Sequence, residues 1–100
     1  MFPAWAQSDA DVITGIEARA EEYIGIAQRI WDLAEVGYQE THSSELLQQL
    51  LRDAGFKVEV GVAGMPTAFV GSYGSGALII GVMAEFDALP GISQDRSPER

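Results

Sequence analysis

Two carboxylates lie close together near the C-terminal end of the sequence, at Glu85 and Asp87. They directly follow residues 77–84, a run of small and aliphatic side chains typical of a β-strand. Side chains at i and i+2 of a strand project to the same side, so the two carboxylates would point together from the strand's end. Ligands and catalytic groups collect at the carboxyl ends of strands in open α/β sheets. Glu85 and Asp87 are therefore candidate catalytic residues, with loop solvation or helix capping as the alternative.

The run at residues 77–84 is the element that must position this pair. It lacks polar alternation, which predicts a strand buried on both faces of a sheet. The turn residues 74–76 precede it, and Pro90 and Gly91 end it. In a chain of 100 residues such a strand would lack some of its neighbours. We therefore expect exposed apolar surface and a tendency to self-associate.

Two helices are predicted ahead of this strand. Apolar residues recur every three or four positions from residue 9 to residue 35, with Ser8 or Asp9 as the N-cap and Gly37 as the terminator. A second helix follows from Thr41, which can cap it, to Gly55, a residue suited to a left-handed terminator. Phe56 is expected to fold back on this helix end. The predicted buried face of the second helix consists of Leu46, Leu47, Leu50, Leu51 and Ala54.

A β-hairpin is predicted between the second helix and the apolar run. Residues 56–62 alternate apolar and polar side chains, as a half-buried strand does, and residues 67–73 form a second strand after the turn 63–66. The fold class is therefore α/β: two N-terminal helices, a β-hairpin and a buried central strand.

The composition limits the chemistry that this chain can perform alone. It has no cysteine, which excludes disulfides, thiol nucleophiles and thiolate metal sites. The single His42 excludes a multi-histidine metal site and is interpreted as a surface histidine beside a helix cap. The net charge of −9 argues against nucleic acid as a partner, because phosphate binding needs a basic surface. No apolar run approaches the length needed to cross a membrane, so no membrane partner is expected.

The two ends of the sequence differ from its middle. Ala4-Trp5-Ala6 has the small-x-small pattern of a signal-peptidase site, without a positive n-region or a long apolar run. Residues 1–8 are thus either the remnant of an export signal or a short flexible N-terminus, which leaves a cytoplasmic or a periplasmic location open. Residues 9–92 carry the predicted helices and strands, and the polar residues 93–100 are expected to form a loose tail.

Two segments carry a resemblance to a known family. Residues 84–91, Ala-Glu-Phe-Asp-Ala-Leu-Pro-Gly, resemble the strand-end motif of the metal-dependent amidohydrolases and aminoacylases, which belong to the zinc carboxypeptidase-like superfamily. Residues 31–41 with Ser43 and Ser44 are similar to the first helix end and connector of the same family. The motif is closest to the aminobenzoyl-glutamate hydrolase branch. The resemblance covers residues 12–94 and implies an incomplete piece of a three-layer catalytic domain.

The resemblance implies hydrolysis of an N-acyl or N-aroyl amino acid with a divalent metal, zinc or manganese, as cofactor. In the broad superfamily the strand-end motif is His-x-Asp, whose histidine binds the metal and whose aspartate supports that histidine. Glu85 stands at the histidine position and Asp87 at the aspartate position. The amidohydrolase branch typically has an acidic residue in the first position, so metal ligation is not carried over to Glu85. That branch takes its metal ligands and its general base from downstream segments, so this chain is not expected to hold a metal tightly.

Three hypotheses follow for the chain as a whole. It is the N-terminal fragment of a metal-dependent amidohydrolase, inactive alone; or a small α/β binding or interaction module without catalysis; or a structural fragment with no site. A homo-oligomer is compatible with each of them. A reading frame that continues into a Cys- and His-rich segment would favour the first.

Overall fold

A computed structural model describes residues 7–92 of the chain. The chain divides between Asp32 and Leu33 into two compact units. The predictions of an export-signal remnant or flexible N-terminus and of a loose tail at residues 93–100 fall mainly or wholly outside the described residues. The described residues form three helices and a two-stranded antiparallel sheet, which confirm the predicted α/β class. None of the described helices is long and apolar enough to cross a membrane.

The first unit contains helix α1 (Asp9–Glu17) and most of helix α2 (Ala20–Leu33). The predicted cap at Ser8 is confirmed: its hydroxyl accepts from the backbone N–H of Asp11, and the Asp11 carboxylate accepts from the backbone N–H of Ser8. The single helix predicted for residues 9–35 is wrong, because it is interrupted at residues 18 and 19. There the N–H of Arg19 bonds to the carbonyl of Ile16, three residues back instead of four. Such a 3₁₀-type bond is a common way for a helix to end.

Helix α2 also ends earlier than the sequence indicates. Ala34, directly after Leu33, adopts a left-handed conformation with φ of 47°, and Tyr38 does the same with φ of 66°. A left-handed conformation costs a residue with a Cβ about 1–2 kcal/mol, so this connector is held by its contacts rather than by local preference. Gly37, the predicted terminator, is not among the residues with positive φ.

The second unit is built on helix α3 (Thr41–Asp53) and its C-terminal turn. Gly55 has φ of 92°, the left-handed conformation predicted for it. The N–H of Phe56 donates to the carbonyl of Leu51 at 2.9 Å, and the N–H of Gly55 donates to the carbonyl of Arg52 at 3.0 Å. These two bonds define a Schellman ending, so the predicted termination is confirmed.

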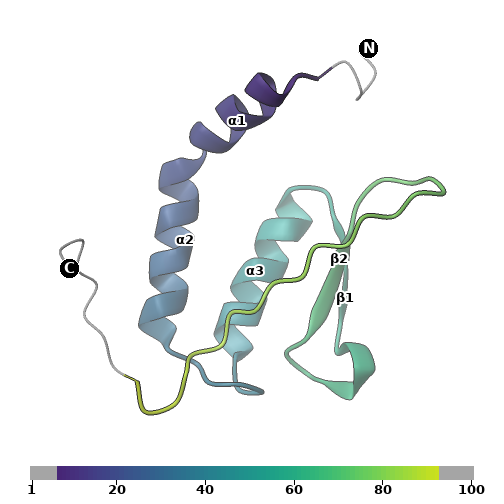
Figure 1. The fold of residues 1–100 in the computed structure, drawn as a ribbon. Helices are drawn as coiled ribbons and strands as arrows, with labels where there is room; N and C mark the ends of the chain where they lie inside the picture. Colours follow the sequence, from purple (N-terminus) through teal and green to yellow (C-terminus); the bar gives the residue numbers. More distant parts are fainter. Residues whose placement is uncertain (1–6, 93–100) are drawn as a thin grey trace. The chain divides into compact units, whose positions relative to one another are not determined.

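The predicted β-hairpin is present as strands β1 (Lys57–Val60) and β2 (Phe69–Ser72), which pair antiparallel with Lys57 opposite Ser72 and Val60 opposite Phe69. The 3₁₀ turn η2 (Val62–Gly64) lies in the connection between them. Gly71 of β2 faces helix α3: a Cβ at this position would lie only 2.8 Å from Leu51 Cδ1. The absence of a side chain at Gly71 therefore lets α3 pack closely on the hairpin. Figure 1 shows α3 beside the two strands.

The surface that α3 buries differs from the predicted leucine face. Leu46, Leu47, Leu50 and Leu51 are only half-buried and Ala54 is exposed, whereas Ser43, Ser44 and Gln48 are fully buried. Among residues 7–92 no hydrophobic side chain is fully buried. The small side chains of Ser43 and Ser44 allow close approach to neighbouring backbone, and hydrogen bonds compensate Ser44 and Gln48 for lost water.

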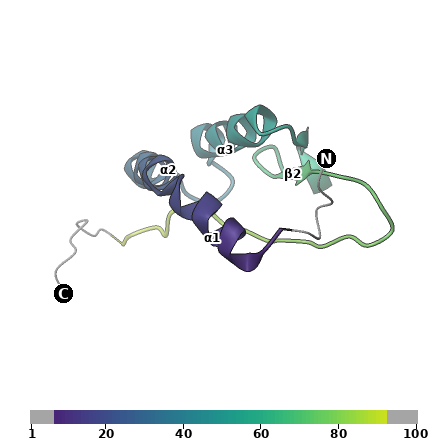
Figure 2. The same cartoon turned by 90° about the horizontal axis from the view of Figure 1, so that it is seen from above.

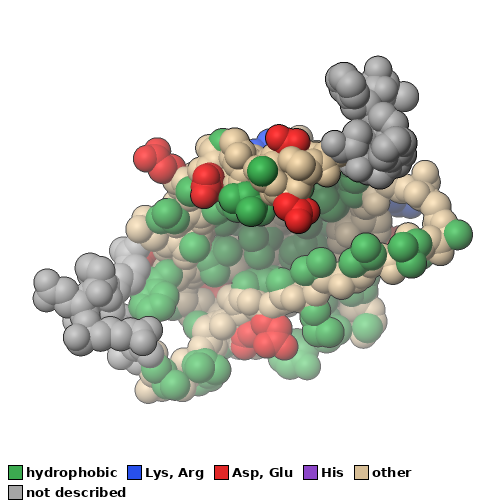
Figure 3. All heavy atoms as spheres, turned by 45° about the horizontal axis from the view of Figure 1, so that its top comes forward, with side chains coloured by type: hydrophobic (Ala, Val, Ile, Leu, Met, Phe, Trp, Pro, Cys, Tyr) green, Lys and Arg blue, Asp and Glu red, His purple; other side chains and the backbone are tan. Residues whose placement is uncertain are grey.

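The predicted buried central strand at residues 77–84 is not observed. This segment forms no strand among the described residues and runs as an extended trace after β2 in Figures 1 and 2. A strand requires neighbouring backbone groups to complete its hydrogen bonds, and the described part of the chain places none along this segment. The expected exposed apolar surface is confirmed. Leu78, Ile79, Ile80, Val82 and Met83 are 82–92% exposed, and hydrophobic side chains project along the segment in Figure 3.

Candidate functional site

The candidate carboxylates Glu85 and Asp87 follow the exposed apolar segment directly. Both residues are exposed. Asp87 lies beside the connector between α2 and α3, because its Oδ2 is 3.6 Å from the place where a Cβ on Gly37 would be. The structure therefore gives Asp87 a neighbour on another segment of the second unit.

A backbone hydrogen bond holds this segment against the connector. The N–H of Ala88 donates to the carbonyl oxygen of Glu35 at 2.7 Å, and Val36 and Ala88 form an isolated parallel β-bridge. This bridge brings together the two segments whose sequences resemble the amidohydrolases, residues 31–44 and residues 84–91. A bridge of this kind fixes the direction of the backbone on either side, and with it the direction in which neighbouring side chains leave the chain.

An aromatic contact holds the same segment from the hairpin side. The rings of Phe86 and Phe69 have centroids 6.1 Å apart and an interplanar angle of 36°. Phe69 belongs to β2, and Phe86 lies between the two candidate carboxylates. Asp87 is thus flanked by one residue that packs on the sheet and one that bonds to the connector.

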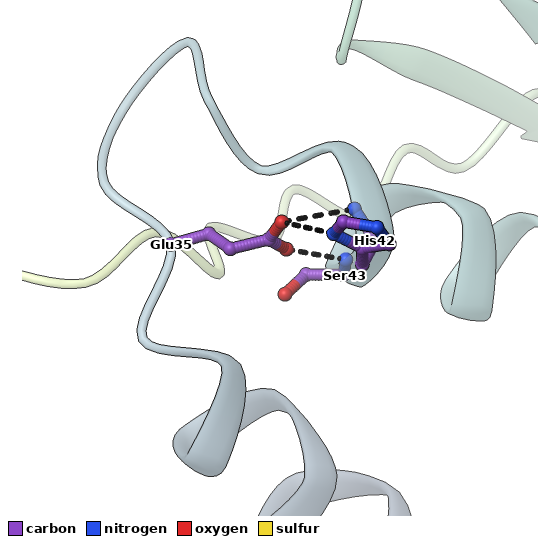
Figure 4. A network of polar contacts seen from close by, with 3 residues as sticks. All are labelled: Glu35, His42 and Ser43. Atoms are coloured by element: carbon purple, nitrogen blue, oxygen red, sulfur yellow. Dashed lines mark hydrogen bonds and ion pairs between the residues drawn. The ribbon is translucent and has the colours of Figure 1, made fainter.

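The side chain of Glu35 caps helix α3 from the connector. Its Oε1 accepts from the backbone N–H of Ser43 at 2.6 Å, and its Oε2 accepts from the backbone N–H of His42 at 3.0 Å (Figure 4). The ring nitrogen Nδ1 of His42 also lies 2.9 Å from Oε2. The residue at the N-cap position, Glu40, makes no side-chain capping bond. The predicted cap at Thr41 is therefore wrong, because Glu35 satisfies the free N–H groups of the first turn.

The environment of Glu35 favours its charged form. Its side chain is only 12% exposed, and this burial alone would raise the pKa. The backbone N–H groups of Ser43 and His42 outweigh burial and lower the pKa from 4.5 to about 2. The His42 ring acts in the same direction. Ser43 Oγ is fully buried and has no hydrogen-bond partner among the described residues.

A second polar network ties the start of α3 to the hairpin. The Thr67 hydroxyl donates to Glu40 Oε2 at 2.7 Å, and this bond is the largest cause that lowers the pKa of Glu40. The other carboxylate oxygen, Oε1, accepts from the backbone N–H of Tyr38 at 3.0 Å. The Ser44 hydroxyl donates to the Thr67 carbonyl at 2.7 Å and accepts from Gln48 at 2.9 Å. Glu40 and Ser44 thus join the connector and α3 to Thr67, in the loop between β1 and β2.

Sequence reasoning identified Glu85 and Asp87 but missed Glu35. Glu35 lies inside the segment that carries the resemblance. Its role as a helix cap, however, depends on the path of the connector, which no local sequence pattern predicts. One sequence feature could have indicated this cap. The N-cap position of α3 holds Glu40 rather than Ser, Asp or Asn, so an upstream acidic residue such as Glu35 was a candidate to cap the helix. His42, interpreted as a surface histidine beside a cap, is exposed and contacts the carboxylate that forms the cap.

The arrangement provides carboxylates but not a metal site. Among residues 7–92 no group of three or more His, Asp or Glu side chains is placed to hold a metal ion. Divalent metals in catalytic sites need three or more protein ligands or several oxygen ligands. The residues present therefore do not fit a resident metal by themselves. What they do is attach the Glu85–Asp87 segment to the connector, which the Glu35 carboxylate holds on the N-terminus of α3.

Comparison with known proteins confirms the resemblance expected from the two segments. No protein-family model matches the chain. It is 43% identical over 79 residues to one subunit of the p-aminobenzoyl-glutamate hydrolase of Escherichia coli, a match that covers 79% of this chain and 16% of that protein. It is 38% identical over 69 residues to thermostable carboxypeptidase 1 of Saccharolobus solfataricus, which covers 67% of this chain and 17% of the relative. The chain spans less than a fifth of the length of these curated relatives.

Proposed function

We propose that residues 9–92 are the N-terminal part of the catalytic domain of a metal-dependent amidohydrolase. The enzyme would cleave the amide between an acyl or aroyl group and an amino acid, with an aminobenzoyl-glutamate as the first candidate substrate. The observation that carries this proposal is the hydrogen bond between Ala88 N and Glu35 O. It joins the two segments that resemble the family, as expected if both serve one site.

Within this enzyme Asp87 would support the catalytic machinery, and Glu85 would shape the acidic edge of the site. Amide hydrolysis requires an activated water, a general base and a group that polarises the carbonyl. A bound divalent metal, zinc or manganese, would supply the polarisation and the activation. The described residues lack a metal cage, so the ligands and the general base would come from other parts of the enzyme. Asp87 would orient one of those ligands through a hydrogen bond, a role in which carboxylates recur at metal sites.

The 100-residue chain alone is proposed to be inactive as an amidase. A relative whose name describes a hydrolase subunit makes an amino-acid amide substrate and a subunit partner reasonable expectations for the enzyme. The oligomeric state and the subunit composition would be measured on an assembled enzyme.

A small α/β interaction module without catalysis is the second candidate function. The exposed aliphatic side chains of residues 78–83 favour it, since contiguous apolar surface of this kind is typical of interaction sites. The two candidates predict different behaviour when the chain is placed in an enzyme. Only the first predicts that its residues can replace a catalytic segment.

A chimeric enzyme distinguishes the two candidates. The matched residues of this chain would replace the corresponding segment of the related Escherichia coli p-aminobenzoyl-glutamate hydrolase subunit, produced together with any other subunit of that enzyme. The proposal predicts hydrolysis of p-aminobenzoyl-glutamate, abolished by a metal chelator. A soluble chimera with the melting temperature of the parent and no hydrolysis would contradict the catalytic proposal and favour the interaction module.

A further inference from the structure

Glu35 makes contacts in two directions from one residue. Its carboxylate receives the N–H groups of His42 and Ser43 at the start of α3, at 3.0 and 2.6 Å. Its backbone carbonyl receives the N–H of Ala88 at 2.7 Å. The first contact fixes the connector on a helix, and the second fixes the candidate site segment on the connector. A displacement of Glu35 would therefore move both.

Two details show how closely the connector constrains Asp87. The Val36–Ala88 bridge sets the two backbones in parallel register. Gly37 is the next residue along the connector. A Cβ placed on it would lie 3.6 Å from Asp87 Oδ2, so an alanine there would make ordinary van der Waals contact with the carboxylate. A longer side chain at residue 37 would need the space that Asp87 occupies.

The preceding residues provide little support of their own. Residues 78–83 are extended and exposed, with no strand assigned to them. Contacts at Phe86 and Ala88 attach the segment to the rest of the second unit. Of the two, the contact at Ala88 depends on a charged residue anchored by several hydrogen bonds. Hydrogen bonds from N–H groups to a carboxylate are stronger than those between neutral groups.

We infer that Glu35 is a positioning residue for Asp87: its carboxylate, locked on the N-terminus of α3, holds the connector in the place where it binds Ala88 and leaves room for Asp87 beside Gly37. The structural part of this inference stands on the contacts alone. Its consequence for turnover rests on the proposed amidohydrolase function. Glu35 touches neither substrate nor metal in this role.

The structural part is tested by amide hydrogen exchange in the 100-residue chain carrying Glu35→Gln. Glutamine keeps the length of the side chain but has one acceptor oxygen, so it cannot receive all three donors. We expect exchange at the Ala88 amide to become about tenfold faster, while the Phe56 amide at the other end of α3 changes by less than about twofold. Glu45→Gln, which removes the same charge from an exposed position on α3, should change neither amide.

An unselective effect would overturn the inference. If Glu35→Gln unfolds α3, both amides lose protection, and Glu35→Asp is then used in the same comparison. Aspartate keeps the charge but withdraws it from the helix by one methylene group. Unchanged exchange at Ala88, or equal acceleration at Ala88 and Phe56 in both variants, would show that Glu35 does not position the segment.

The functional part is tested in the chimeric enzyme. Glu35→Gln should lower kcat by about tenfold with less than about a twofold change in KM, because a positioning defect weakens interactions made in the transition state. Gly37→Val should act in the same direction with Glu35 intact. Unchanged kcat in both variants would overturn this part. If the unmutated chimera is inactive, the proposed function fails, while hydrogen exchange still decides the structural inference.

Discussion

The backbone N–H of Ala88 lies 2.7 Å from the carbonyl oxygen of Glu35 and donates a hydrogen bond to it. The two residues belong to segments far apart in the sequence, and both segments resemble the same family of hydrolases. Glu35 simultaneously caps helix α3 through its side chain. One residue therefore connects a helix N-terminus to the loop that bears Asp87.

Two adjacent serines provide a matched test of the polar packing under α3. Ser44 Oγ bonds to Thr67 O and Gln48 Nε2, whereas the equally buried Ser43 Oγ has no hydrogen-bond partner. Ser44→Ala removes the hydrogen-bond partner of both Thr67 O and Gln48 Nε2, and it should lower the free energy of unfolding by about 1–3 kcal/mol. Ser43→Ala should leave it unchanged or raise it. Urea unfolding of the two variants measures the difference, and equal destabilisation by both would contradict the network.

Acidification should weaken the Glu35 cap. The folded-state pKa of Glu35, about 2, lies below its ordinary value of 4.5, because N–H donors favour the carboxylate. The cap therefore contributes its full stability above pH 4.5 and loses it progressively as the pH falls towards 2. The melting temperature of the wild-type chain should exceed that of Glu35→Gln near neutral pH, and the two should converge on acidification. A difference that is constant with pH would show that the charge of Glu35 does not stabilise the fold.

Local features of the fold were predictable from the sequence, and features that depend on distant pairing were not. Gly55 and Phe56 were assigned correctly because a Schellman ending is encoded within six residues. Glu35 was missed because its partners lie across an irregular connector. The leucine stripe of α3 is less buried than its period predicts, since periodicity alone does not reveal that Ser44 bonds to Thr67 and Gln48 to Ser44. Residues 77–84 have the composition of a buried strand, but strand pairing is non-local and the described residues offer it no neighbour.

The exposed aliphatic segment should make the chain self-associate. Its side chains, including Ile80 at 82% exposure, are unpaired and apolar, which favours edge-to-edge association. Ile80→Lys should lower the light-scattering mass at high concentration. Val70→Lys, the same change at a half-exposed hairpin position (47%), controls for the added charge and should have a smaller effect. A wild-type chain that remains monomeric at millimolar concentration would contradict this prediction.

The chain alone should bind zinc weakly and show no amidase activity. Glu85 and Asp87 offer at most two carboxylates, and the single histidine, His42, is already in contact with Glu35. Isothermal titration calorimetry with zinc should reveal no tight stoichiometric site. Hydrolysis of an N-acyl amino acid by the purified chain, abolished by a chelator, would contradict the account, as would a tight one-to-one zinc complex.

Asp87→Ala in the chimeric enzyme tests the central claim most directly, because Asp87 is the residue that the Glu35–Ala88 hydrogen bond is proposed to hold. Turnover of p-aminobenzoyl-glutamate and metal content per subunit would be measured beside the melting temperature, with Asp53→Ala as an exposed control at the end of α3. We predict a loss of about 10–100-fold in activity or metal affinity with the fold intact. Turnover and metal content equal to those of the unmutated chimera would reduce Asp87 to a loop carboxylate and contradict the account.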